Sequence, residues 1–369
     1  MNQPASPLTT WFRRLFSSSN KSGVRPSPAA SKAVQPRETP APAAAAAAAQ
    51  DAWLDYAPDF GPYAQALGMD FQLPPQLTAA QSEQVAQLAA AVMEAAAQDD
   101  GGPQSLPTAS LRILNLVAKS DVEITELASA ISQDPALTAA TLRVANSAAL
   151  GPISGEITTV REAIVRMGIA ESGRVAGAVA AKTLFSARSK SAHALFTREY
   201  TELHLAAAGA AGGAAYLAME RGTGRSDMAY LGGMLHDVGK SLALGALATL
   251  VLDKRAPREL EPVVLQAILE TTHLELGSQA HERWALPGYL TALCASHHDA
   301  SVSDHPSQLE LHFVRVVSGL QALRATPQPL ERVSELTQSI SVLGLRPLQV
   351  RALDAEQRRR GQRLREALT

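Results

Sequence analysis

The clearest chemical signal in this 369-residue sequence is the adjacent pair His236-Asp237, which follows the apolar run Met228–Leu235. Imidazole nitrogens and carboxylate oxygens are both good ligands for divalent metals. Adjacent residues do not share one face of a helix, so both can reach one ion only where a helix ends and the backbone turns. Because the preceding run is apolar and small, we expect a buried helix that ends with two metal-binding groups in a dry pocket.

The elements that position this pair are expected to be helices, and the composition predicts an all-α protein. Alanine is abundant and only 4% of the residues are aromatic. Alanine has the best helix propensity, whereas strands favour β-branched and aromatic residues. The single cysteine, Cys294, excludes an internal disulfide framework and a thiolate zinc site, which is typical of a protein in a reducing cytoplasm.

Charge and hydropathy indicate a soluble protein. The formal net charge of −2 gives no overall attraction to nucleic acid or to an anionic membrane, so we do not expect a nucleic-acid partner. We identify no stretch that is long and apolar enough to span a bilayer. The N-terminal run Trp11–Phe16 is too short and too charged to be the core of a signal peptide. We therefore expect a cytoplasmic protein with no transmembrane segment.

The chain divides into four segments. Residues 1–50 are basic and rich in Pro, Ala and Ser, and we predict a disordered tail because they cannot bury enough apolar surface to offset chain entropy. Residues 51–103 carry aromatic residues among prolines, which we interpret as an extended strap, then an alanine-rich helix and a breaking Asp-Asp-Gly-Gly-Pro run. A helical domain over 104–305 follows. Further helices over 306–369 are expected to pack on that domain or to extend it.

Several helix boundaries in the domain carry local signals. Asp134-Pro135 predicts a helix start, because Asp can accept hydrogen bonds from free amide groups and Pro at the first helical position loses nothing. Asn146-Ser147 predicts the end of that helix, where both side chains can satisfy free carbonyls and hold the next loop. A further helix is expected to open at Thr158 and to stop at Gly168. Gly232-Gly233 lies inside a helical pattern, which indicates close helix packing around the pocket.

A series of motifs occurs in a recognisable order and spacing. The motifs are Leu106-Pro107, Ile131-Ser132-Gln133-Asp134-Pro135-Ala136-Leu137, Ala145-Asn146-Ser147, Ala163-Ile164, Met167-Gly168, Leu235-His236-Asp237-Val238-Gly239-Lys240, His273-Leu274-Glu275-Leu276-Gly277, Trp284-Ala285-Leu286-Pro287 and His297-His298. Together they resemble the HDOD domain family, an all-helical relative of the HD phosphohydrolases found in bacterial signalling proteins. The resemblance covers about residues 104–305. It implies a bundle of two helical halves, and a family that is generally non-catalytic.

The same resemblance implies a set of candidate metal ligands. The HD enzymes use an early His, the His-Asp pair and a later Asp, and the related HD-GYP phosphodiesterases add histidines between them. The matching residues are His236, Asp237, His273, His297 and His298. His204 is the one upstream candidate for the early His, but the register places that ligand near Ala206 or Ala207, roughly a half-turn away. Ser318 stands where the superfamily has its late Asp, so the set is incomplete.

These observations favour a non-catalytic regulatory protein of bacterial signal transduction. It would bind a partner protein, or a small ligand such as a nucleotide, and we expect neither a catalytic residue nor a cofactor. The alternative is a metal-dependent phosphohydrolase or phosphodiesterase of the HD type, with Fe, Mn or Zn held by an intact site and His204 completing the shell. Contact with nucleic acid or membrane through basic residues at the two ends is a third idea, against which the net charge argues.

Overall fold

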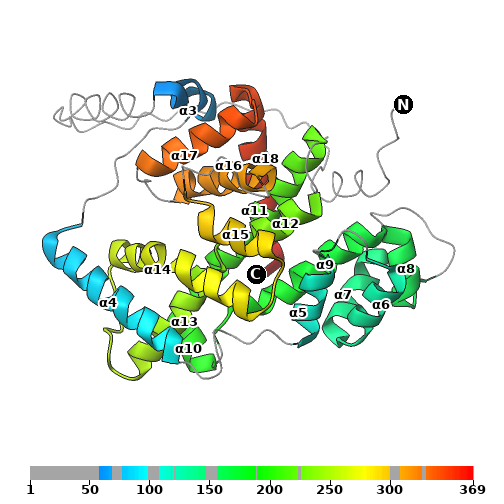
Figure 1. The fold of residues 1–369 in the computed structure, drawn as a ribbon, viewed down its shortest axis with the longest axis horizontal. Coiled ribbons are helices and arrows are strands. Elements are labelled where there is room, and N and C mark those ends of the chain that lie inside the picture. The colour runs from blue at the N-terminus through cyan, green and yellow to red at the C-terminus, as the bar shows by residue number, and fades with distance from the viewer. Residues whose placement is uncertain are drawn as a thin grey trace, which may run out of the picture.

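The structure is a computed structural model, and its described residues contain helices and turns but no strand. The described residues are 58–68, 77–98, 108–117, 119, 122–146, 156–187, 189–222, 226–299, 308–325 and 330–368. The predicted all-α fold of two helical halves is confirmed (Figure 1). The predicted disordered tail over 1–50 lies outside the described residues.

The first helical half is a small bundle. Its helices are α5 (Thr108–Val117), α6 (Ile124–Ser132), α7 (Pro135–Ala145), α8 (Val160–Met167) and α9 (Ile169–Lys182). Apolar side chains at helical spacing form its interior, among them the fully buried Leu114, Ile131 and Ile164. α9 packs on α5 and α7 and also reaches α12, so it joins this half to the second one (Figure 1).

Local signals in the first half act as the sequence predicts, with one shift. Asp134 Oδ1 accepts a hydrogen bond from the Leu137 amide at 3.1 Å, which caps α7. The Asn146 amide group donates to the carbonyl of Ile157 at 2.8 Å and accepts from its N–H at 2.9 Å. Ser147 lies outside the described residues. Gly168 ends α8 with a positive φ of 84°, a conformation that favours glycine.

The start of α8 differs from the expectation by two residues. The helix begins at Val160 and not at Thr158, because Thr159 is the capping residue. Its hydroxyl accepts from the Glu162 amide, and the Glu162 carboxylate accepts from the Thr159 amide. This reciprocal arrangement satisfies two amides that have no partner within the helix.

The second half contains the longest helices. They are α10 (Lys190–Leu195), α11 (Thr197–Arg221), α12 (Ser226–Leu235), α13 (Val238–Leu252), α14 (Pro262–Arg283) and α15 (Gly288–Ser296), after the short 3-10 turn η3 (Thr183–Phe185). α12 packs along α11, and α13 packs along α14. Leu235, Val238 and Leu247 are fully buried at the centre of this half.

Helices outside the expected domain pack on this second half. α4 (Ala79–Gln98) lies against α13 and α14 and contributes Val92 to the main core. α16 (Gln308–Ala325) packs on α11 and α12, with α17 (Leu330–Val342) against α16 and α18 (Pro347–Leu368) against α11. Figure 1 shows these C-terminal helices together at one end of the second half. α16 and α17 therefore lie close to the helices that carry the His-Asp pair.

Two expectations from the sequence are corrected here. Residues 58–67, expected in an extended strap, form the 3-10 turn η1 (Pro58–Phe60) and α3 (Gly61–Leu67), because burial of Phe60 and packing on α18 support a helix there. Segment Ser226–Leu252 has the length and composition of a membrane-spanning helix, contrary to our expectation of none. It comprises α12 and α13, which a turn at His236-Asp237 separates, and 67% of its apolar window is buried.

Candidate metal centre

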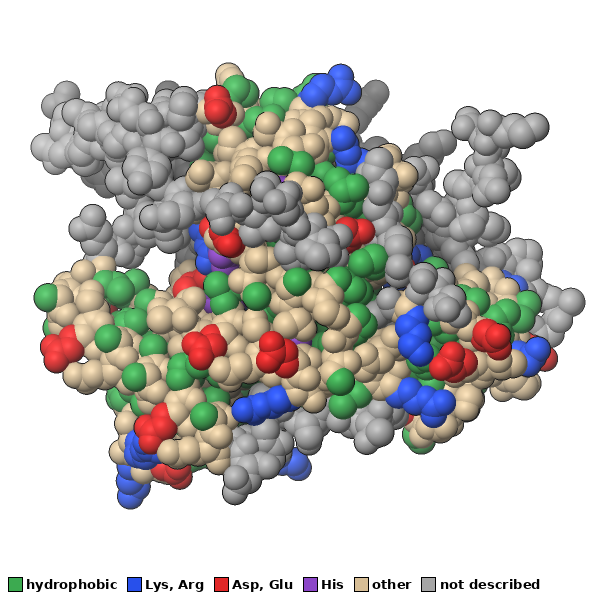
Figure 2. Space-filling model, in the orientation of Figure 1, with side chains coloured by type: hydrophobic (Ala, Val, Ile, Leu, Met, Phe, Trp, Pro, Cys, Tyr) green, Lys and Arg blue, Asp and Glu red, His purple; other side chains and the backbone are tan. Residues whose placement is uncertain are grey.

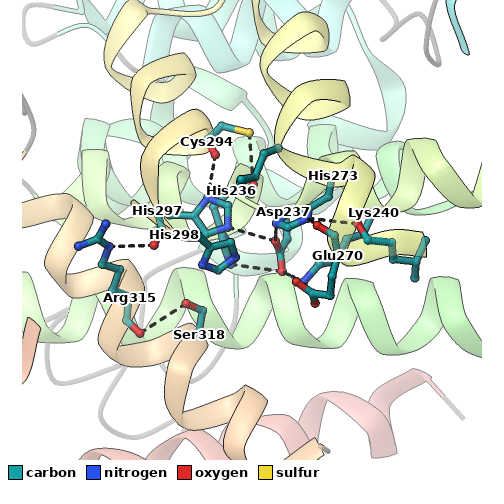
Figure 3. A network of polar contacts seen from close by, with 12 residues as sticks. His236, Asp237, Lys240, Glu270, His273, Cys294, His297, His298, Arg315 and Ser318 are labelled. Atoms are coloured by element: carbon teal, nitrogen blue, oxygen red, sulfur yellow. Dashed lines mark hydrogen bonds and ion pairs between the residues drawn. The ribbon is translucent and has the colours of Figure 1, made fainter. Parts of the chain in front are cut away.

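The candidate site lies where three parts of the second half meet: the turn between α12 and α13, the middle of α14 and the C-terminal end of α15. His236 and Asp237 form the turn between α12 and α13, as the sequence predicts. His273 projects from the middle of α14, while His297 and His298 follow the last residue of α15. The close view shows these side chains converging from the three elements (Figure 3).

Glycines allow the helix backbones to approach closely at this point. A Cβ on Gly239 would lie 1.9 Å from the His273 carbonyl oxygen, and one on Gly277 would lie 2.6 Å from Cys294 Sγ. A Cβ on Gly233 would lie 2.7 Å from the backbone of Ala210. At Gly239 and Gly233 the obstacle is backbone, so only glycine permits these crossings, whereas at Gly277 the Cys294 side chain would have to move. The expected role of Gly232-Gly233 in close packing is confirmed, and Gly277 of the motif 273–277 has the same role.

Four side chains place donor atoms around one point. The Oδ1 atom of Asp237 lies 3.4 Å from His297 Nε2 and 3.6 Å from His273 Nε2. One ligand atom from each of Asp237, His273, His297 and His298 lies within 4.8 Å of the others. Two ligands of a tetrahedral ion, each about 2.1 Å from it, are about 3.4 Å apart. The separations between Asp237 and the two imidazoles therefore match one first-row divalent ion.

Hydrogen bonds at the far side of each imidazole orient its free nitrogen toward that point. The Nδ1 atom of His273 lies 2.9 Å from the Glu270 carbonyl, and that of His297 lies 2.8 Å from the Cys294 carbonyl. The Nδ1 atom of His298 lies 3.1 Å from Glu335 Oε2. Carbonyl and carboxylate oxygens only accept, so each Nδ1 carries a proton and the other ring nitrogen, Nε2, is left to face the shared point. This is the usual outer arrangement around metal-binding histidines.

The ring nitrogens that point toward the shared position have no hydrogen-bond partner, and those of His273 and His297 face the carboxylate oxygen Asp237 Oδ1. The Nε2 atoms of His273, His297 and His298 and the Oδ1 atom of Asp237 are all buried without one. An imidazole lone pair that faces a carboxylate oxygen is repelled unless a proton or a cation lies between them. Burial lowers the pKa of His273 to about 3, so protonation at neutral pH does not supply that charge. The donor set therefore fits a divalent cation.

His236 lies beside this group rather than in it. Its Nδ1 lies 3.0 Å from the Gly233 carbonyl, and its Nε2 faces the other carboxylate oxygen of Asp237, Oδ2, at 3.6 Å. Its ring meets that of His297 edge-on, with 5.1 Å between centroids. Burial lowers the pKa of His236 to about 4, so it is neutral near pH 7.

An ionic network that the sequence reasoning missed surrounds the cluster. Lys240 Nζ lies 2.8 Å from Asp237 Oδ2 and 2.9 Å from Glu270 Oε1. Arg332 of α17 contacts Glu270 at 2.7 Å and Glu335 at 3.3 Å. Lys240 lies one helical turn after Asp237, and that spacing was a usable signal. Arg332 and Glu335 have the same three-residue spacing, whereas Glu270 lies 62 residues before Arg332, too far for such a signal.

This network sets the charges of the site. Burial alone would raise the pKa of Asp237, but the Lys240 ammonium and the neighbouring imidazoles outweigh burial and hold that pKa well below its ordinary value. Burial alone would lower the pKa of Lys240, but the carboxylates of Asp237 and Glu270 outweigh it and raise that pKa. Asp237 is therefore anionic and Lys240 cationic at neutral pH.

A small cavity of about 50 Å³ adjoins the cluster and is partly walled by α16 and α17. Ser318 lines it, at the place where the resemblance expects a late Asp. Arg315 of α16 also lines it and donates to the carbonyls of His297 at 2.8 Å and Ser296 at 2.9 Å, which holds the end of α15. In the space-filling view, histidine surface appears in a recess bordered by basic and acidic side chains (Figure 2).

His204 does not join the cluster, which corrects the expectation that it could complete the shell. Its ring stacks on Phe185 with 5.5 Å between centroids, and it is absent from the converging donors. Burial and the nearby Lys182 lower the pKa of His204.

Comparisons with known proteins agree with this architecture. The family model described as "HDOD domain" matches residues 104–300. An uncharacterized protein of Treponema pallidum (strain Nichols) is 27% identical over 223 residues, 58% of this chain, and the match spans only 40% of that relative's length.

Two solved structures share the fold. An HDOD domain protein of unknown function from Geobacter sulfurreducens is 22% identical, with a TM-score of 0.54, over 77% of this chain and 98% of its own. A protein from Shewanella amazonensis SB2B, provisionally named a metal-dependent phosphohydrolase, is 18% identical, with a TM-score of 0.51, over 74% of this chain and 99% of its own. At these identities the structures are evidence for the fold alone.

Proposed function

This chain belongs to the HDOD domain family, and from that premise we propose that it is a regulatory protein of bacterial signalling that acts by binding. Its His-Asp cluster holds one divalent cation as a structural clamp between α13, α14 and the end of α15. The cation does not serve hydrolysis. The molecule that the protein regulates is a partner protein or a small ligand.

The observation that carries this proposal is the number of donors around the single point. Asp237, His273, His297 and His298 offer four protein ligands. Structural zinc sites are closed by four protein ligands, whereas catalytic sites keep a position open for water or substrate. A hydrolase must activate a water molecule on its metal. A tetrahedral cation such as Zn²⁺, bound by all four side chains here, has no such open position.

The incomplete superfamily set supports the same conclusion. His204 stacks on Phe185, away from the donors, and Ser318 replaces the late carboxylate. A serine hydroxyl is a weak substitute for an anionic carboxylate ligand, because it brings no charge to the cation. With these two ligands missing, the site lacks the groups that would hold a metal in the open geometry of an HD enzyme.

The size of the cavity bears on which ligand is bound. A buried water molecule needs a cavity volume of about 10–15 Å³. The cavity of about 50 Å³ beside the cluster therefore holds only a few water-sized groups. A nucleotide does not enter a cavity of that size without movement of α16 or α17. The proposal therefore favours a protein partner over a nucleotide at this site.

The alternative function is phosphate-ester hydrolysis, and one specific observation favours it. Lys240, Arg315 and Arg332 line the cavity beside the cluster, and basic side chains of this kind stabilise a phosphate. This function requires one of the four donors, such as His298 with its Glu335 partner, to swing away and leave an open metal position.

Metal content and hydrolysis, measured together, test the proposal. We expect purified tag-free protein to hold one equivalent of Zn, Mn or Fe by elemental analysis and to leave phosphomonoesters and cyclic dinucleotides intact. A His236→Ala/Asp237→Ala double variant should lose the metal. His204→Ala is the matched control, since it removes a histidine outside the cluster, and it should keep the metal.

The possible outcomes separate the two functions. Ester hydrolysis that disappears in the double variant would establish the alternative and reject the binding role of the cluster. Absence of metal from the wild type would reject the cation clamp. If the double variant restores normal behaviour to a strain that lacks the gene for this protein, the partner-binding role does not need the cation.

A further inference from the structure

We propose that α17, a helix outside the family-matched residues 104–300, controls the fourth ligand of the cluster, His298, through Glu335. When α17 is docked the cation has four protein ligands, and when α17 is displaced it has three. This inference rests on the cation site of the proposed function and adds its regulation. Glu335 is a positioning residue, because it acts on the cation only through His298.

The three imidazoles of the cluster differ in what orients them. The Nδ1 atoms of His273 and His297 each face a carbonyl oxygen three residues earlier in the chain. Such partners belong to the same helix, so these two orientations are fixed once α14 and α15 have formed. The Nδ1 atom of His298 instead faces Glu335 Oε2, 37 residues later and on another helix. The orientation of His298 therefore depends on how α17 docks.

His298 is also the least enclosed of these three histidines. Its side chain is 19% exposed, whereas those of His273 and His297 are 1% and 0% exposed. All three rings lie around the same point (Figure 3). A partly exposed ring can turn to another rotamer, but a fully packed ring cannot do so without disturbing its neighbours. His298 is therefore the ligand that is free to leave when its outer partner is removed.

α17 reaches the metal centre through ionic contacts and one apolar contact. Glu335 Oε2 accepts from His298 Nδ1 at 3.1 Å. Arg332 contacts Glu335 at 3.3 Å and Glu270 of α14 at 2.7 Å, which holds α17 against the helix of His273. Leu336 is buried and lines the cavity beside the cluster. Displacement of α17 removes the partner of His298 and one wall of this cavity together.

The number of protein ligands decides what the cation can bind. Four ligands close a tetrahedral site, whereas three leave a position for water or for another donor. A partner that displaces α17 would therefore open the cation to a further ligand. The coupling is reciprocal, because a cation that fixes His298 also favours its contact with Glu335. Cation binding should thus strengthen the docking of α17.

The experiment measures amide hydrogen exchange of the full chain with and without Zn²⁺, together with Zn²⁺ affinity by chelator competition. In the wild type we expect Zn²⁺ to slow exchange in α17 more than in α7 of the first half. In Glu335→Ala the affinity should fall about 10–100-fold, the usual loss for an outer partner of a metal-binding histidine. Saturating Zn²⁺ should then no longer slow exchange in α17 selectively.

Two further variants separate positioning from simple packing. Glu335→Gln keeps a side-chain oxygen that can accept from His298 Nδ1, so it should retain the wild-type response to Zn²⁺. Glu282→Ala makes the alanine change at an exposed glutamate of α14 and is the matched control, which should behave as the wild type. If Glu335 only supported the packing of α17, its loss would speed exchange there equally with and without Zn²⁺.

The results distinguish this inference from the proposed function. Zn²⁺ that binds the wild type without a selective effect on α17 would overturn the inference alone, even if Glu335→Ala fails to fold. A folded Glu335→Ala with wild-type affinity and wild-type slowing of α17 would also overturn it alone. No Zn²⁺ bound to the wild type would overturn both the inference and the cation clamp. Selective slowing that is lost in Glu335→Ala and kept in Glu335→Gln would establish it.

Discussion

Replacing Gly239 with alanine should force α13 and α14 apart and damage the metal centre. The added Cβ would lie 1.9 Å from the His273 carbonyl oxygen and 2.8 Å from the Gly277 amide nitrogen. Ordinary contacts begin at 3.4 Å, so the first of these must open by about 1.5 Å. Both obstacles are backbone atoms, and no change of rotamer can relieve the clash.

The cost follows from packing and helix propensity. Overpacking a core in which side chains can move costs about 1–3 kcal/mol, and a backbone obstacle belongs at the upper end or beyond. Alanine gains about 1 kcal/mol over glycine inside a helix. We therefore expect Gly239→Ala to lower the free energy of unfolding by at least about 2 kcal/mol. His273 moves with α14, so metal affinity should fall as well.

Gly245→Ala is the matched control on the same helix. Its added Cβ would meet only Tyr200 Oη, at an ordinary distance of 3.7 Å. This variant should therefore raise stability by up to about 1 kcal/mol through helix propensity alone. Urea unfolding followed by circular dichroism measures both changes, and chelator competition measures metal affinity. Equal stability and equal affinity of the two variants would refute the claim that close helix crossing builds the site.

Three further predictions concern other parts of the molecule. Asn146→Ala removes both hydrogen bonds to Ile157 and should cost about 1–3 kcal/mol in urea unfolding; a loss below about 0.5 kcal/mol would contradict the loop-holding role. In chelator-treated protein, the depressed pKa of His236 means that the unfolded chain protonates first, so stability should fall from pH 6.5 to about 4 by about 3 kcal/mol from this residue. His236→Gln should flatten that fall, and parallel urea midpoints for variant and wild type across this range would disprove the assignment. Arg332→Gln removes the ion pair with Glu270 and should speed amide hydrogen exchange in α17 but not in α7; unchanged exchange in α17 would show that packing alone holds this helix.

Features that depend on a few neighbouring residues were predictable from the sequence. Asp134 caps α7, Asn146 holds the following loop, and Gly168 ends α8, each through contacts within about a dozen residues. The two-residue error in the start of α8 arose because Thr158 and Thr159 have the same side chain, and either could precede the helix. Only the backbone geometry and the reach of Glu162 select Thr159.

Features that depend on contacts between distant helices were not predictable in this way. The sequence placed His236-Asp237 at a helix end, and the family motifs indicated His273, His297 and His298 as their partners. The ion pair between Lys240 and Glu270 joins residues that are 30 positions apart, and the pair between Glu270 and Arg332 joins residues that are 62 positions apart. No local sequence pattern encodes either contact.

The sequence by itself determined the helical class, the glycines that permit close helix crossings, and the residue types that can bind a cation. These follow from propensity and side-chain chemistry, which belong to each residue. Only the tertiary structure decided which donors converge, because the packing of α11 against η3 stacks His204 on Phe185, away from the cluster. It also decided that Asp237 Oδ1 faces the imidazoles of His273 and His297, since these contacts depend on how α14 and the end of α15 lie against the turn at Asp237.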